Sequence, residues 1–71
     1  MRKINVVVST LSQEVFEDLV NKFEEKGVSI IEKRYDLLYH RYEIYVRLNH
    51  RQCYTIQRFI KPRNASLMVL S

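Results

Sequence analysis

The segment from Arg41 to Pro62 limits most strongly what this chain can fold into, because the period of its apolar residues changes once within it. The first eight residues alternate between apolar and polar or charged side chains, as in a half-buried strand. After Asn49, apolar residues recur at helical spacing, at Cys53 and Ile56, until Pro62 ends the pattern. The segment predicts a strand over residues 41–48 that leads directly into a helix over residues 49–60.

A second helix is predicted nearer the N-terminus, over residues 10–26. Thr10 and Gln13 have the spacing of a capping box at its start. Gly27, the only glycine in the chain, follows its end, where a left-handed backbone conformation is usually needed. Its apolar residues form one stripe along the helix: Leu11, Val15, Phe16, Leu19, Val20 and Phe23.

Three further strands are expected, over residues 3–10, 28–39 and 65–70, with a turn around Asp36 to His40. Neither Asn-Gly nor Asp-Gly occurs at that turn, so the register of the hairpin stays open. The order β-α-β-β-α-β predicts an α+β, ferredoxin-like split βαβ fold, an antiparallel sheet with both helices on one face. Seventy-one residues are too few for two cores, so we expect a single domain over residues 1–71.

The charge of the chain is unevenly distributed. Residues 1–32 hold four Lys or Arg and six Asp or Glu, a net of −2, whereas residues 33–71 hold eight and two, a net of +6. This asymmetry suggests an anionic partner for the second half, although a solvated basic surface explains it equally well.

The residue types in the chain argue against an enzyme. A single glycine leaves no Gly-rich phosphate loop, and His40, His50 and Cys53 are too few for a typical structural zinc site. Cys53 and His50, three residues apart on one helix, could form a Cys–His nucleophile pair, but we expect Cys53, on the apolar stripe, to be a small buried hydrophobe. The chain is therefore expected to be non-enzymatic, with no metal or cofactor.

The setting is expected to be cytoplasmic, without membrane insertion by this chain. One cysteine excludes an internal disulfide framework. No apolar run approaches the roughly 18 residues that a membrane span needs.

The sheet face away from the helices is the first candidate for a functional surface. We expect it to carry Val7, Ile31, Lys33, Tyr35, Glu43, Tyr45 and Arg47. So much apolar surface needs covering, which favours an interface in a homo-oligomer. Tyrosines interleaved with basic residues also resemble the sheets of RNA-binding domains, so binding of single-stranded nucleic acid is the alternative.

The start of the second predicted helix is the second candidate. Free amides at a helix N-terminus favour anions, and Asn49, His50 and Arg51 lie there, with Arg47 on the preceding strand. These residues are predicted to bind a small anionic ligand. In the alternative interpretation, Arg51 pairs with a carboxylate or is solvated.

The same region resembles a known bacterial module. The chain resembles the small soluble C-terminal domain of YitT-type membrane proteins. The similar residues are Asn49, Arg51 and Gln52, the helix through Phe59-Ile60-Lys61, Pro62 and Ala65, the strand Leu67-Met68-Val69-Leu70, and the opening Val6-Val7-Val8-Ser9. This chain lacks that family's glycine before the third strand and the acidic residue of the last loop. The resemblance implies the fold and the cytoplasmic setting. The family is similar in topology to regulatory ligand-binding domains and has no established activity, so we expect a regulatory or interaction module.

Overall fold

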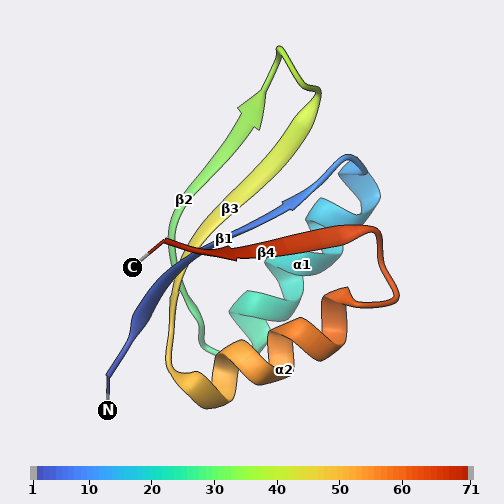
Figure 1. The fold of residues 1–71 in the computed structure, drawn as a ribbon. Coiled ribbons are helices and arrows are strands. Elements are labelled where there is room, and N and C mark those ends of the chain that lie inside the picture. Colours follow the sequence, from blue (N-terminus) through green and yellow to red (C-terminus); the bar gives the residue numbers. More distant parts are fainter. Residues whose placement is uncertain (1, 71) are drawn as a thin grey trace.

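The computed structural model of this chain describes residues 2–70, which form six elements in the predicted order. These are β1 (Ile4–Thr10), α1 (Gln13–Glu25), β2 (Ser29–Asp36), β3 (Arg41–Leu48), α2 (His50–Ile60) and β4 (Ala65–Val69). The strands form one sheet in the order β2-β3-β1-β4, and all three neighbouring pairs are antiparallel. Both helices cover the same face of this sheet (Figure 1), so the prediction of an α+β, ferredoxin-like arrangement is confirmed. No helix within residues 2–70 is long and apolar enough to cross a membrane.

The core lies between the sheet and the two helices. Its buried residues are Val6, Val8, Ile44, Val46 and Leu48 from the sheet, Leu19 and Phe23 from α1, Val28 from the segment before β2, and Ile56 and Ile60 from α2. Alternation along β1 and β3 directs every second side chain into this layer. Val7 points to the other face, yet it is only 8% exposed, because β1 is a central strand and its neighbours there are Tyr45 and Met68.

The start of α1 differs from the prediction. The helix is capped by Ser12, whose hydroxyl accepts a hydrogen bond from the backbone N–H of Val15 at 3.2 Å. Thr10 is instead the last residue of β1, and its hydroxyl donates to the carbonyl of Asn64 at 3.1 Å. Leu11, expected on the apolar stripe, is 72% exposed. The predicted capping box at Thr10 is therefore wrong, because pairing in the sheet extends β1 to that residue.

Strand β2 ends at Asp36 and contains a bulge near its start. Ile30 lies opposite Val46 and Glu32 lies opposite Tyr45, so Ile31 is an extra residue on the β2 side. One inserted residue exchanges the two faces for the rest of the strand.

The bulge corrects the expected composition of the open sheet face. Lys33 lies opposite Ile44, and Tyr35 lies opposite Tyr42, so both share the face that the helices cover. The ring of Tyr35 lies 4.6 Å from that of Tyr42, which in turn lies 5.1 Å from Phe16 of α1. The prediction that Lys33 and Tyr35 lie on the open face is wrong, and Glu32 and Arg34 take their places.

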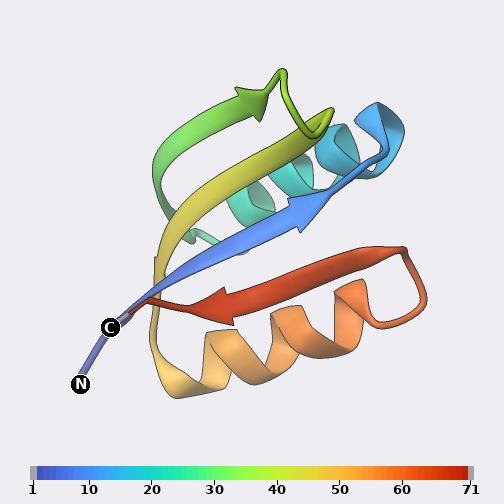
Figure 2. The ribbon, with the colours of Figure 1, turned by 45° about the horizontal axis from the view of Figure 1, so that its top comes forward.

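The remaining boundaries follow local rules. Gly27 has a φ of +68° after α1, and Asn49 and Gln52 form the predicted capping box at the start of α2. After β4, the backbone N–H of Leu70 donates to the carbonyl of Asn5 at 2.8 Å. The end of the described chain therefore lies beside the start of β1 (Figure 2).

Candidate functional site

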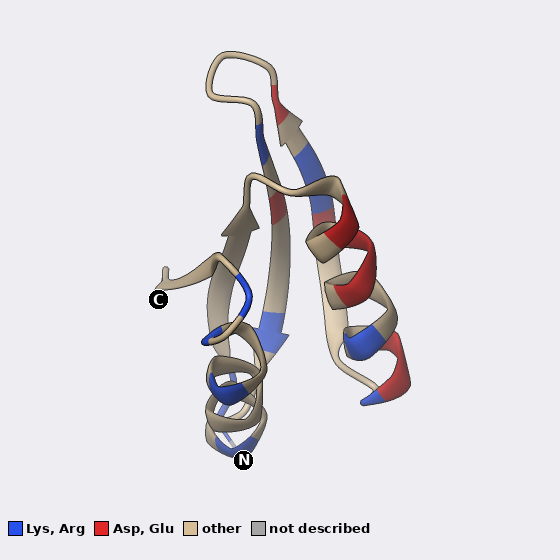
Figure 3. Ribbon diagram, turned by 90° about the vertical axis from the view of Figure 1, so that its right-hand side faces the viewer, with Lys and Arg blue, Asp and Glu red and all other residues tan. Residues whose placement is uncertain are grey.

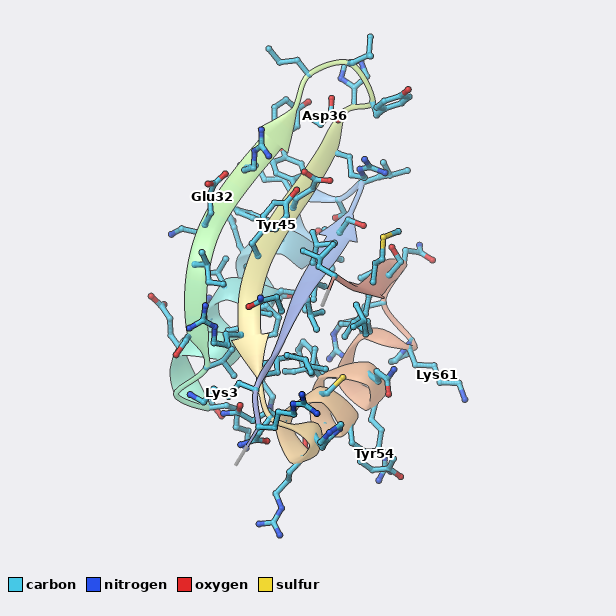
Figure 4. All side chains as sticks on the ribbon, turned by 60° about the vertical axis from the view of Figure 1, so that its left-hand side comes forward. Lys3, Glu32, Asp36, Tyr45, Tyr54 and Lys61 are labelled. Atoms are coloured by element: carbon cyan, nitrogen blue, oxygen red, sulfur yellow. The ribbon has the colours of Figure 1, made fainter. Side chains whose placement is uncertain are left out.

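The open face of the sheet presents its side chains in rows that cross the strands. The strand register defines a central row of Met68, Val7, Tyr45 and Glu32, from β4 to β2. One flanking row contains Ser66, Ser9, Glu43 and Arg34, and the other contains Asn5, Arg47 and Ser29. Figure 4 shows Tyr45 and Glu32 on the neighbouring strands β3 and β2. The central row is apolar over its first three positions.

Charged side chains around Tyr45 neutralise one another. Arg34 pairs with Glu32 at 3.1 Å, and its guanidinium carbon lies 5.8 Å from the centre of the Tyr45 ring. A hydrogen bond with Tyr45, followed by the charge of Glu32, raises the pKa of the exposed Arg34 above its ordinary value. The Tyr45 hydroxyl donates to Glu43 at 3.2 Å, and Glu43 also pairs with Arg41 at 3.3 Å.

Arg47 lies on the other side of Tyr45, in a less neutralised environment. Its Nε donates to the side-chain oxygen of Asn5 at 3.2 Å, and the side chain is exposed. Ile31, Tyr45 and Leu70 line a shallow hollow of about 300 Å³ together with Arg34 and Arg47. Of the residues predicted for the open face, Val7, Ile31, Glu43, Tyr45 and Arg47 therefore do lie on it.

The tip of the β2–β3 hairpin is a surface that the sequence interpretation missed. Leu37, Leu38 and Tyr39 are 76%, 78% and 64% exposed. The carboxylate of Asp36 accepts from the backbone N–H groups of Leu38 at 3.0 Å and Tyr39 at 3.3 Å, which orders the turn. The sequence placed a turn around Asp36 to His40, and the available signal was the apolar run Leu37-Leu38-Tyr39 within that turn.

This tip is continuous with the open face. Leu37 and Leu38 line a hollow of about 570 Å³ together with Arg34, Glu43 and Tyr45. The tip and Tyr45 therefore line one hollow, with the charged side chains of Arg34 and Glu43 between them.

The structure does not bring the residues of the predicted anion site, at the start of α2, together around one cavity. The Asn49 side chain accepts from the backbone N–H of Gln52 at 2.8 Å, so the helix end is already capped by the protein itself. His50 and Arg51 are exposed, and Arg51 lines a hollow of about 170 Å³ with Lys26. Arg47 lines the open-face hollow instead. The ligand site formed by Asn49, His50, Arg51 and Arg47 stays a prediction without a shared cavity.

Two further expectations concern metal and cysteine chemistry. Within residues 2–70, no group of three or more His, Cys, Asp or Glu side chains is arranged to hold a metal ion. Cys53 packs against the core from α2, as predicted, but it is half-buried and not fully buried.

Comparison with known proteins adds no relatives. No protein-family model matches the chain. No curated protein matches it, and no solved structure does. The resemblance to the C-terminal domain of YitT-type membrane proteins therefore remains a prediction.

Proposed function

We propose that this protein is a non-catalytic interaction module that pairs with a second copy through the open face of its sheet. One observation carries the proposal: Glu43 and Arg47 flank Tyr45 symmetrically on β3, two residues to either side. The apolar part of the central row, Met68, Val7 and Tyr45, separates these opposite charges. Such a surface is complementary to itself, which is the requirement for a symmetric pair.

The geometry of the pair follows from this arrangement. A two-fold axis between two stacked sheets, parallel to the central row, makes β3 antiparallel to β3 of the second copy. Tyr45 then faces Tyr45, and Glu43 faces Arg47 of the second copy at two equivalent places. Stacked sheets lie about 10 Å apart, a distance that a Glu and an Arg side chain span together. The same axis stacks the apolar parts of the two central rows and makes Glu32 face Glu32 of the second copy, where each carboxylate is paired with its own Arg34 at 3.1 Å.

The amount of surface supports a pair of this kind. Ile31, Met68 and Leu70 are 55%, 64% and 49% exposed. The two larger extents of the molecule are 36 and 22 Å, so the roughly 800 Å² per partner of a standard interface is the upper limit of what this face can bury. Contiguous exposed apolar surface of this kind marks interaction sites more often than solvated faces.

Complementary charge reversals test the proposal. Arg47→Glu and Glu43→Arg should each sediment as a monomer of 8.6 kDa, because like charges then face each other across the axis. An equimolar mixture of the two variants should sediment at twice that mass, because the carboxylates of one copy then face the guanidinium groups of the other. Recovery in the mixture also shows that both variants fold.

The matched control is Lys33→Glu, which makes the same change of charge on the helix-covered face. It should leave the dimer intact. A wild type that stays at 8.6 kDa up to high concentration contradicts the proposal, and so does a mixture that stays monomeric.

The other expectations gain less support. Of the tyrosines predicted for this face only Tyr45 lies on it, and Glu32 and Glu43 would meet a phosphate backbone there, so the geometry does not favour nucleic-acid binding by the sheet. A regulatory role, a small anionic ligand at Arg51 and a cytoplasmic setting remain parts of the proposal. The lone, half-buried Cys53 supports that setting, since it offers no disulfide within the chain.

A further inference from the structure

The two helices carry opposite charges although they lie on the same face of the sheet (Figure 3). Helix α1 contains five acidic residues and one basic residue, Lys22. Helix α2 contains Arg51 and Arg58 and no acidic residue, and Lys61 follows at its end. The sequence has no Asp or Glu anywhere from Ile44 to Leu70.

The cations of α2 differ from Arg34 and Arg41 of the sheet in having no carboxylate partner. Arg34 pairs with Glu32, and Arg41 pairs with Asp36 and Glu43. Within the described residues, no ion pair involves a cation of α2 or of the loop that follows it.

One cation of the loop after α2, Arg63, already makes contacts within the protein. Arg63 donates to the carbonyl of Phe59 at 2.7 Å, and its guanidinium carbon lies 3.9 Å from the centre of the Phe59 ring. Arg51, Arg58 and Lys61 are exposed and remain without a carboxylate partner. Uncompensated positive charge therefore runs along α2 itself, where no acidic residue lies nearby in the sequence.

These residues share one side of the helix with an exposed aromatic ring. Arg51, Tyr54, Arg58 and Lys61 are spaced i, i+3, i+7 and i+10, so they form one stripe about 15 Å long, here called the α2 basic face. Tyr54 is 62% exposed, and Arg58 lies 5.8 Å from the centre of its ring. Tyr54 and Lys61 both project outward from α2 in Figure 4.

We propose that the α2 basic face binds a nucleic-acid backbone. Successive phosphates of a strand advance about 3.4 Å along the axis, so a stripe of this length spans several of them and presents three cations. Tyr54, between two of the cations, supplies a ring on which a base can stack. The stripe carries one large apolar side chain, which argues against a protein interface with an apolar centre. The acidic surface of α1 repels phosphate and so confines the strand to α2.

Fluorescence anisotropy with labelled single-stranded and duplex oligonucleotides tests this proposal. Wild-type affinity should fall steeply between about 50 and 200 mM salt. Arg51→Gln and Arg58→Gln should each weaken binding and reduce the slope of log affinity against log salt by about one. Tyr54→Ala should weaken binding to the single strand more than binding to the duplex.

Arg34→Gln on β2 is the matched control, because it removes the same charge from the sheet. It should leave affinity and slope close to the wild type, and an equal loss there would show that net charge alone binds the oligonucleotide. Absence of wild-type binding at low salt overturns the proposal. If Arg51→Gln alters sedimentation and no oligonucleotide binds, the partner is instead an acidic protein surface such as α1 of a second copy. The proposed sheet-face dimer is independent, since Arg58→Gln should leave its mass unchanged.

Discussion

At the scale of single residues, Gly27 shows how one backbone conformation directs the chain from α1 into β2. With φ at +68°, the N–H of Gly27 donates to the backbone carbonyl of Glu24, and the N–H of Val28 donates to the carbonyl of Phe23 at 2.9 Å. A Cβ added at Gly27 would meet no atom within 4 Å. The cost of any side chain here is therefore conformational and not steric crowding by neighbours.

We expect Gly27→Ala to lower the free energy of unfolding by about 1–2 kcal/mol, because an L-residue disfavours the left-handed region. Gly27→Asn should cost less, since Asn enters that region more readily. Urea denaturation of the three proteins measures the difference. Equal stability of the Ala variant and the wild type would show that this position does not need a positive φ.

At the scale of elements, the sequence predicts where helices and strands lie better than which way their residues face. The period change at Asn49 identifies β3 and α2 with their boundaries nearly correct, because alternation and helical spacing are both unambiguous there. In β2, two adjacent isoleucines precede a run of three charged residues, and neither pattern marks which residues point inward. Only pairing with β3 decides that Ile31 is the extra residue, which is why Lys33 and Tyr35 were placed on the wrong face.

The choice of cap at α1 is a second case in which long-range contacts decide. Thr10 and Ser12 both carry a hydroxyl suited to capping. Thr10 is paired with Tyr42 and Ala65 in the sheet, and this excludes it from the helix. The sequence identified Val7, Ile31, Glu43, Tyr45 and Arg47 as open-face residues. It could not identify the rows that they form with one another and with Met68, because those rows depend on the register between strands that are distant in the sequence.

Asn49→Ala should lower the free energy of unfolding by about 1 kcal/mol, because it removes the acceptor for the backbone N–H of Gln52. The loss should affect the whole fold, since α2 contributes Ile56 and Ile60 to the core. Thr55→Ala, on the exposed side of the same helix, is the control and should change stability little. Chemical denaturation followed by circular dichroism compares them, and an unchanged Asn49→Ala midpoint would contradict the role of the cap.

At the scale of the whole molecule, the small core makes stability sensitive to association. A chain of this length buries only about 60% of the surface that its unfolded form exposes. Burial of the open face in a dimer would add stability that depends on protein concentration.

We therefore expect the melting temperature of the wild type to rise with protein concentration, by about 4 °C per tenfold increase once the dimer dominates. The Arg47→Glu variant should melt at a temperature that does not depend on concentration. Differential scanning calorimetry over a dilution series measures both. A wild-type melting temperature that stays constant across the series would count against association through the sheet.

The hydrogen bond from the N–H of Leu70 to the carbonyl of Asn5 brings the two ends of the described chain together. Because the first strand begins where the last one finishes, the fold is nearly cyclic. A circular permutant, in which a short linker joins these neighbouring segments and new ends open at Leu38, would keep every strand pairing of the sheet. The opening would fall at the far end of the strands, in the exposed hairpin tip. Such a permutant would separate the contribution of the tip to the stability of the fold from that of the sheet, and it would leave every core residue unchanged.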